Sequence, residues 1–210
     1  MPKGSETLTN ARRSEIIEAC EKLYQTMSFK EITIKEIGGA TSFTRTSIYN
    51  YFQTKEEIFL ALLDQEYELW AAELQSILNE NESLDRDSFA DKIAKSLDHR
   101  RQLLKIMSMN MYDIEENSRM ERLIEFKTMY GKSLQIFEEL LVKFFPAMGA
   151  PERQKLIYCF FPFTYGIYPY VVVTDKQREA MKEAGVNYTY LSIYEITRNC
   201  LIRLLPDAES

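Results

Sequence analysis

The sequence is poor in the residues on which disulfide-rich, metal-binding and disordered proteins depend. Its 210 residues include only three cysteines, one histidine, seven glycines and six prolines. Cys20, Cys159 and Cys200 lie far apart without metal-binding spacing, which predicts reduced thiols in a cytoplasmic protein. The low glycine and proline content excludes a linker-rich or disordered chain. The first residues lack the apolar run of a secretory signal, so we expect no export.

The motifs of common catalytic sites are missing as well. Because His99 is the only histidine, motifs that need two histidines are excluded. The nucleophile pattern G-x-S-x-G, the phosphate loop G-x-x-x-x-G-K and the dinucleotide pattern G-x-G-x-x-G do not occur. The plentiful carboxylates fall on the polar faces of expected helices. We therefore predict no catalytic residue, cofactor or metal site, and we expect His99 at the surface or at a helix end.

One stretch raises the question of a membrane span. Residues Leu156 to Val173, LIYCFFPFTYGIYPYVVV, contain no charged residue and approach the minimum length for crossing a bilayer. Two prolines, one glycine and four tyrosines interrupt the stretch, and no second stretch like it exists. We expect a buried helix or a subunit interface here and no membrane contact.

Charge is distributed unevenly along the chain. The first 55 residues hold eight Lys and Arg against six Glu, whereas the remainder holds 18 basic and 26 acidic residues. An acidic protein with a mildly basic head can bind a polyanion through that head alone, although this signal is weak by itself.

Apolar residues recur at helical spacing nearly throughout, and no convincing pair of strands is found. The sequence therefore predicts an all-α protein. The expected helices cover residues 11–27, a short segment from Ile34, a short segment from Thr44 to Tyr51, and residues 55–78, 87–98, 100–111, 117–145, 152–172, 175–184 and 188–205.

Several of these boundaries carry capping signals. Thr33 with Glu36 and Thr54 with Glu57 have the spacing of capping boxes, which places helix starts at Ile34 and Lys55. The pair Gly38 and Gly39 weakens the second helix and allows another backbone to approach closely.

The short helices around residues 34–51 have the arrangement of a helix-turn-helix, braced by the helix before them. Ile48 and Phe52 form an i,i+4 pair that can be buried, which leaves the polar side chains of the second short helix outside. Hydroxyls and an arginine near the start of a helix suit base edges in the major groove, and arginine suits guanine best. Tyr49, Tyr51 and the free N–H groups of the helix starting at Lys55 suit phosphate oxygens.

The segment TSFTRTSIYNYFQTKEEIFLALL resembles the recognition segment of the tetracycline-repressor (TetR) family. That family ends its recognition helix in an aromatic-rich motif and places a lysine at the start of the next helix. Four residues match these positions: Tyr49, Tyr51, Phe52 and Lys55. The preceding EIIEACEKLYQTMSFKEITIKEI is also similar, through its apolar stripe, the Phe29 corner and the helix start at Thr33. The specific similarity covers residues 11–65, and farther on only length and helical character agree.

Two residues depart from the family pattern. The family usually has glycine in the turn, where Ser42 stands, and often glycine where Thr46 stands. Ser42 must therefore accept or avoid a positive φ angle. Thr46 adds a methyl and a hydroxyl to the DNA-facing side, so base preference cannot be copied from relatives.

The resemblance implies a DNA-binding domain in residues 1–54 and a helical effector-binding and dimerisation domain in residues 55–210. It implies a ligand-responsive repressor that binds a palindromic DNA operator as a homodimer. The residues expected to contact DNA are Thr33, Thr44, Arg45, Thr46, Ser47, Tyr49, Asn50, Tyr51 and Lys55. The alternative from the residues alone is a helical sensor or adaptor that binds a small molecule without specific DNA recognition.

The effector pocket and the dimer interface are assigned less directly. Methionine and tyrosine suit an apolar or aromatic effector. The expected pocket residues are Trp70, Met107, Met111, Tyr112, Phe126, Met129, Tyr130, Phe161 and Tyr165, each of which can equally be ordinary core. The expected interface helices are residues 156–172 and 188–205. The latter has a stripe of Tyr190, Ile193, Thr197, Cys200, Leu201 and Leu204, which can also be buried within one protomer.

Overall fold

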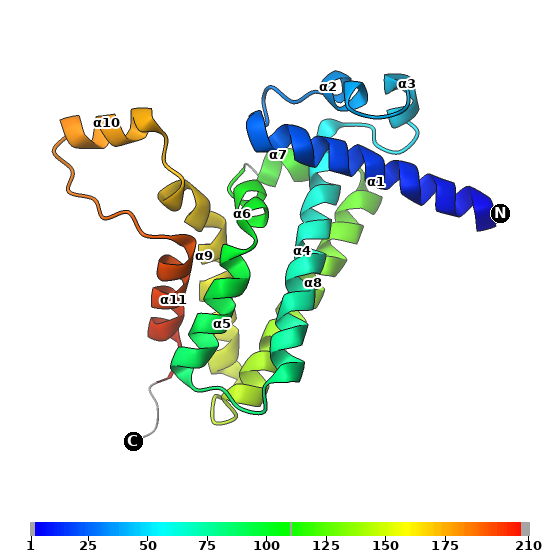
Figure 1. Cartoon of the computed structure of the whole chain (residues 1–210). Coiled ribbons are helices and arrows are strands. Elements are labelled where there is room, and N and C mark those ends of the chain that lie inside the picture. Colours follow the sequence, from blue (N-terminus) through cyan, green and yellow to red (C-terminus); the bar gives the residue numbers. More distant parts are fainter. Residues whose placement is uncertain (1–2, 110, 207–210) are drawn as a thin grey trace. The chain divides into compact units, whose positions relative to one another are not determined.

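The computed structural model of the chain describes residues 3–109 and 111–206, with side chains from residue 7 onward. These residues form eleven helices and no strand, which confirms the all-α prediction (Figure 1). The helices are α1 (Lys3–Thr26), α2 (Ile34–Gly39), α3 (Arg45–Ile48), α4 (Lys55–Glu80), α5 (Arg86–Asp98), α6 (Arg101–Met107), α7 (Met111–Glu116), α8 (Met120–Phe144), α9 (Ala150–Val171), α10 (Asp175–Glu183) and α11 (Ile193–Leu204).

The chain divides into two compact units. Unit 1 comprises Met1–Gln65 and Asn110–Thr128, and unit 2 comprises Glu66–Met109 and Met129–Ser210. The domain boundary expected after residue 54 therefore differs from the structural division. The first turns of α4, all of α7 and the start of α8 pack with the N-terminal helices, because side chains of α4 such as Ile58 and Phe59 complete their core.

Unit 1 buries the apolar faces of α1, α2, α3 and the start of α4 against one another. Its fully buried side chains include Ile16, Ile32, Ile37, Ile48, Phe52 and Phe59. The ring of Phe59 meets Tyr24 and Phe29 edge-on, with centroid distances of 5.0 and 4.9 Å. The corner expected at Phe29 is thus held by aromatic packing, which fixes where α2 begins.

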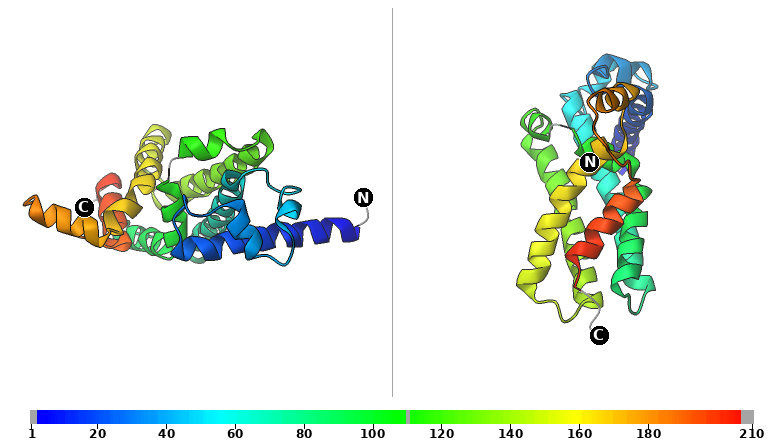
Figure 2. Two further views of the ribbon diagram at one scale, coloured as in Figure 1. Left: turned by 90° about the horizontal axis from the view of Figure 1, so that it is seen from above. Right: turned by 90° about the vertical axis from the view of Figure 1, so that its left-hand side faces the viewer.

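Unit 2 has a core rich in aromatic rings. Trp70, Phe89, Phe137, Phe160 and Phe161 are all almost wholly buried. Helix α11 packs most extensively on α5 and also touches α9, whereas α10 has no buried residue and stands apart from α5 and α11 (Figure 2).

The apolar stripe of α11 is used inside the protomer. Ile193, Thr197 and Leu201 are buried where α11 packs on α5 and α9. The interpretation of this stripe as a subunit interface is therefore wrong for these three residues, because a neighbouring helix of the same unit already covers them.

The region between α6 and α8 differs from the expected pair of helices at 100–111 and 117–145. Helix α6 ends at Met107, a separate α7 follows, and α8 begins at Met120. The hydroxyl of Ser108 donates to the carbonyl of Lys105, and Asn117 and Ser118 donate back to carbonyls of α7 at 2.7 Å. These local side-chain hydrogen bonds compete with helix continuation and end α6 and α7 early.

No single helix of residues 3–109 and 111–206 is long and apolar enough to cross a membrane. Helices α9 and α10 reach that length and apolarity only as a pair, which bends by 84° at the break between them.

Candidate nucleic-acid interface

Helices α2 and α3 pack at very short range. Thr33 caps α2 by accepting hydrogen bonds from the N–H groups of Lys35 and Glu36 at 3.2 and 3.4 Å. A Cβ added to Gly38 would lie 3.2 Å from the Cα of Arg45, whereas one added to Gly39 would meet nothing within 4 Å. The close approach expected of the glycine pair is therefore required at Gly38 alone.

A matched pair of substitutions tests this contact. Gly38→Ala is expected to lower the free energy of unfolding by about 1–3 kcal/mol, because the new methyl meets backbone that no rotamer change can move. Gly39→Ala is expected to leave stability unchanged or raise it by up to about 1 kcal/mol, since alanine is the better helix former. Thermal unfolding of the two variants measures the difference, and equal stability would contradict the assigned contact.

The turn between α2 and α3 avoids a positive φ angle. The described residues include no residue other than glycine with positive φ, so Ser42 adopts an ordinary backbone conformation. Its N–H and its hydroxyl both donate to the carboxylate of Glu15 on α1. These two hydrogen bonds lower the pKa of Glu15 and tie the turn to α1. Ser42, which stands where the family usually has glycine, is thus anchored to α1 through hydrogen bonds to Glu15.

Helix α3 has one buried and one exposed side. Ile48 and Phe52 are fully buried. Thr44, Arg45, Thr46, Tyr49 and Asn50 are exposed, and Ser47 is half-buried. The Arg45 guanidinium donates to the Tyr49 hydroxyl at 3.4 Å, and the Thr44 and Ser47 hydroxyls are 3.0 Å apart. The structure thus brings the expected base-reading residues together on one face, and their contact with DNA stays a prediction.

Lys55 lies differently from the other expected contact residues. Its ammonium donates to the carbonyls of Phe29 and Ile32 at 2.7 and 3.1 Å and lies 4.1 Å from the centre of the Phe29 ring. Lysine has three N–H donors, so at most one remains for a phosphate. In this structure Lys55 therefore connects the start of α4 to the loop before α2. Its position in the sequence motif did not indicate this structural role.

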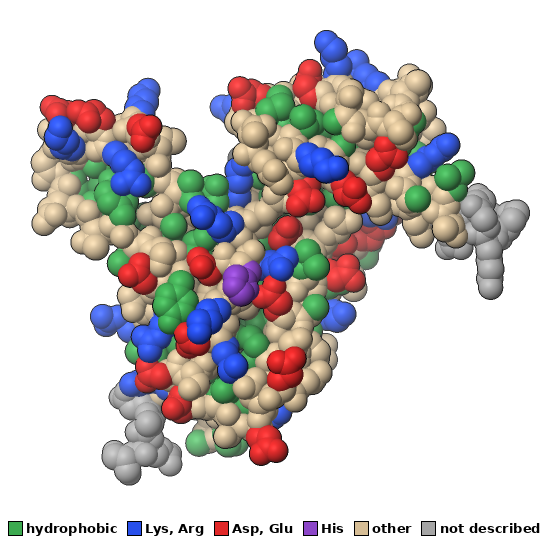
Figure 3. All heavy atoms as spheres, viewed as in Figure 1, with side chains coloured by type: hydrophobic (Ala, Val, Ile, Leu, Met, Phe, Trp, Pro, Cys, Tyr) green, Lys and Arg blue, Asp and Glu red, His purple; other side chains and the backbone are tan. Residues whose placement is uncertain are grey.

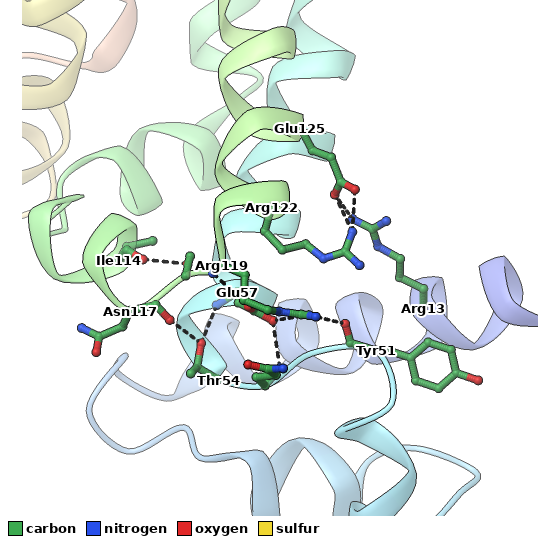
Figure 4. Close-up of polar contacts among 11 residues, drawn as sticks. Arg13, Tyr51, Thr54, Glu57, Ile114, Asn117, Arg119, Arg122 and Glu125 are labelled. Carbon is green, nitrogen blue, oxygen red and sulfur yellow. Dashed lines mark hydrogen bonds and ion pairs between the residues drawn. The ribbon is translucent and has the colours of Figure 1, made fainter.

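An ion pair with a buried carboxylate joins the start of α4 to the turn between α7 and α8 (Figure 4). Glu57 is fully buried, and its carboxylate accepts from the Gln53 N–H, the Arg119 N–H and the Arg119 guanidinium. The same guanidinium donates to the carbonyl of Tyr51 at 3.2 Å. Burial raises the pKa of Glu57, but these hydrogen bonds outweigh it and the net pKa is lowered. The carboxylate is therefore ionised at neutral pH.

A second contact braces Phe52. The guanidinium groups of Arg13 and Arg122 lie 5.6 and 5.9 Å from the centre of its ring. Both arginines bond to Glu125 on α8, at 2.7 and 2.6 Å (Figure 4). Because the three charged groups and the ring support one another, the end of the recognition segment is fixed by α1 and α8 together.

Sequence reasoning did not find Arg119, Arg122 or Glu125. It assigned Glu57 only to a capping box with Thr54, and Thr54 does accept the Glu57 N–H at 3.2 Å. The stretch SRMERLIEF at 118–126 contains both arginines, but nothing in its local pattern indicates a partner 62 residues away.

On the face shown in Figure 3, basic and acidic side chains are interspersed, so no patch of one charge marks a binding surface there. Among residues 3–109 and 111–206, no group of three or more His, Cys, Asp or Glu is placed to hold a metal ion.

The residues expected to line an effector pocket divide between the two units. Met111, Tyr112 and Phe126 belong to unit 1, and Tyr112 is 87% exposed. The other six belong to unit 2: Trp70, Met107, Met129, Tyr130, Phe161 and Tyr165.

Tyr67, which the sequence did not single out, joins this group in unit 2. Its hydroxyl lies 3.5 Å from that of Tyr165 and 3.7 Å from the sulfur of Met107. Its ring contacts Trp70 and, edge-on, Tyr130. Burial, followed by the neighbouring tyrosines, raises the pKa of Tyr67 well above its ordinary value, so its hydroxyl stays neutral.

A groove of 710 Å³ lies between α8 and α9 in unit 2. Its walls are mostly apolar and aromatic, and Tyr158 at its edge is 71% exposed. The residues that line it are Tyr130, Gly131, Leu134, Gln135, Glu138, Ala150, Pro151, Gln154, Ile157, Tyr158, Phe161 and Pro162.

Two family models match almost the whole described chain. Residues 16–62 match the bacterial regulatory proteins of the tetR family, and residues 64–205 match a tetracyclin repressor-like C-terminal domain. The second match alone covers more than half of the chain.

Curated relatives match over a shorter stretch. The HTH-type transcriptional repressor Rv1474c of Mycobacterium tuberculosis is 29% identical over 72 residues, which is 34% of this chain and 38% of that protein. The HTH-type transcriptional repressor AcnR of Corynebacterium diphtheriae is 28% identical over 81 residues, 39% of this chain and 40% of that protein. The matches thus span about two fifths of those relatives.

Among solved structures, the fatty acid degradation regulator FadR of Bacillus halodurans is similar with a TM-score of 0.59. That match covers 93% of this chain and 95% of FadR at 15% sequence identity, so it supports the fold.

Proposed function

This chain belongs to the tetracycline-repressor family of bacterial regulatory proteins, and on that basis we propose that it is a repressor that binds a palindromic operator as a homodimer. A small apolar or aromatic molecule that binds unit 2 releases the operator. A ligand can do this only by binding the DNA-free arrangement more tightly, so ligand and DNA compete by linkage.

The observation that carries the proposal is the exposed face of α3 within the stretch matched by the tetR-family model. Arg45, Thr46 and Asn50 are exposed above the buried Ile48 and Phe52, as a helix that enters the major groove requires. No comparable observation favours a sensor or adaptor that ignores DNA.

Selection of bound sites from random duplex DNA with the purified full-length protein tests the proposal. One palindrome with half-sites about one helical turn apart is the expected result, because a two-fold dimer places two recognition helices about 34–36 Å apart. A steep fall of affinity with salt should accompany it. Recovery of no preferred sequence, with weak and salt-insensitive binding, would instead favour the sensor or adaptor.

Arg45→Ala tests which side chain reads bases. We expect a loss of about 1–3 kcal/mol in binding the selected palindrome and relaxed preference at one base pair of each half-site, since a bidentate arginine–guanine contact contributes that much. Lys176→Ala on α10 removes an equal charge from the other unit and should leave the preference intact. Competition between duplexes that differ at single positions measures the effect. Unchanged preference in Arg45→Ala would exclude Arg45 as a base-reading residue.

The effector is proposed to bind beside the aromatic group around Tyr67 in unit 2. Flat rings with a few hydroxyl groups suit an apolar or aromatic molecule that carries one polar substituent. Trp70 lies in this group and is the only tryptophan of the chain, so its fluorescence can report binding during a screen of small molecules.

The dimer interface is proposed to lie on α8 and α9. Regulators of this family act as dimers, and among the described residues the groove between these helices leaves apolar side chains such as Tyr158 exposed. The buried stripe of α11 is no longer a candidate for the interface, because α5 and α9 cover it within the protomer. Helix α9, the other helix expected at the interface, is retained.

A further inference from the structure

The polar cluster around Glu57 lies outside the helices of the helix-turn-helix motif and yet bonds to the segment that follows α3. We propose that Arg119 is a positioning residue for DNA recognition. Its guanidinium is held by Glu57 and donates to the carbonyl of Tyr51, and it thereby fixes the turn at Tyr51 and Phe52 that ends the recognition helix. This inference rests on the proposed function as a DNA-binding repressor.

The geometry orients the guanidinium on two sides. The Arg119 Nε and one terminal nitrogen donate to Glu57 at 2.6 and 2.8 Å, and that terminal nitrogen also donates to the Tyr51 carbonyl at 3.2 Å. The backbone N–H of Arg119 donates to Glu57 at 3.0 Å, so the backbone is held as well as the side chain. A planar guanidinium with fixed donor directions can serve carboxylate and carbonyl together.

Neighbouring contacts hold the same turn in place. The hydroxyl of Thr54 donates to the carbonyl of Asn117 at 2.8 Å, which joins the two segments a second time. Glu57 reaches back to the Gln53 N–H at 2.8 Å. The turn between α7 and α8 therefore contacts the segment from Tyr51 to Glu57 at several points (Figure 4).

The recognition segment needs such support from outside. Helix α3 has only four residues, far fewer than the roughly 12–15 that an isolated helix needs to be stable in water. The N–H groups of Tyr51 and Phe52 bond to the Ile48 carbonyl at 2.8 and 3.0 Å, which continues the turn past α3. A cation on a carbonyl at the end of this turn stabilises it, as basic side chains do at helix C-termini.

A direct phosphate contact is the competing role for Arg119, since its side chain is 37% exposed. The two roles differ in their salt dependence. Loss of a phosphate contact reduces the slope of log affinity against log salt by about 0.9, whereas loss of a positioning residue leaves the slope unchanged.

The test uses two full-length variants that avoid leaving Glu57 as a buried unpaired charge. Arg119→Lys keeps a positive charge near Glu57 but lacks the fork that also reaches Tyr51. The double variant Glu57→Gln with Arg119→Ala removes both charges. Lys127→Ala is the control, because Lys127 on α8, which follows Arg119, pairs with Glu115 at 2.6 Å on the exposed surface.

We expect both variants to lose about tenfold in affinity for the palindrome selected with the wild-type protein, the scale of one hydrogen bond to a charged group. Affinity for an unrelated duplex should change by less than about twofold, and the salt slope should stay at the wild-type value. The melting temperatures of both variants should remain close to that of the wild-type protein. The control Lys127→Ala should bind the palindrome with wild-type affinity.

Three results would overturn the proposal. Wild-type affinity in both variants would show that the Tyr51 contact does not position the segment. Affinity losses that only follow losses of melting temperature would reduce Arg119 to a structural residue, and a smaller salt slope would make it a phosphate contact. Failure of the wild-type protein to select any palindrome is a separate result, which would reject the proposed function itself.

Discussion

Phe52→Ala is expected to abolish operator binding while leaving unit 2 folded. Phe52 lies in the link between α3 and α4 and its side chain is fully buried, and truncation of a buried phenylalanine costs about 3–5 kcal/mol. It also removes the ring beneath the guanidinium groups of Arg13 and Arg122. Because whole domains are stable by only about 5–15 kcal/mol, unit 1 should lose much of its ordered population.

The two units allow this outcome to be separated from general unfolding. Trp70 belongs to unit 2, so its fluorescence should keep the emission of a buried tryptophan in the variant. Far-ultraviolet circular dichroism should show a partial loss of helix, and binding of the selected palindrome should vanish. Phe52→Leu retains apolar volume, so it should lose less helix and less affinity for the palindrome than Phe52→Ala. Operator binding at wild-type affinity in Phe52→Ala would contradict this account of unit 1.

Local signals in the sequence located the helix-turn-helix well. The Thr33 cap, the Gly38 contact and the i,i+4 pair of Ile48 and Phe52 each depend on residues within a few positions of one another. Such relations follow from helix geometry alone. The fold class and the exposed side of α3 were therefore predictable without any knowledge of tertiary structure.

Relations between distant segments were not predictable in this way. Glu57 has the spacing of a capping residue, and its pairing with Arg119 depends on where the turn between α7 and α8 comes to lie. The stripe of α11 correctly indicated a buried side but not its neighbour, which is α5. Similarly, the sequence analysis expected the exposed Tyr112 in a pocket and did not single out the buried Tyr67. Periodicity identifies the side of a helix that is covered, and only the tertiary fold identifies what covers it.

The proposed subunit interface leads to the second large effect. Leu134→Glu or Ile157→Glu places a carboxylate in the groove between α8 and α9, where both side chains are half-buried. Burying an unpaired charge is costly, so each variant should shift the dimer to monomer. A monomer reads one half-site alone and loses the gain from linked binding, which amounts to roughly 10²–10⁴ in affinity.

Sedimentation velocity should then show monomers at concentrations at which the wild-type protein is dimeric, together with a comparable loss of affinity for the full palindrome. Affinity for a single half-site should be unchanged, because unit 1 is untouched. Lys155→Glu, on the exposed surface of α9 outside the groove lining, controls for added negative charge and should remain dimeric. If the groove variants stay dimeric and bind the palindrome normally, the interface lies elsewhere. If they become monomeric, the apolar surface of α8 and α9 sets the spacing at which two copies of α3 read one operator.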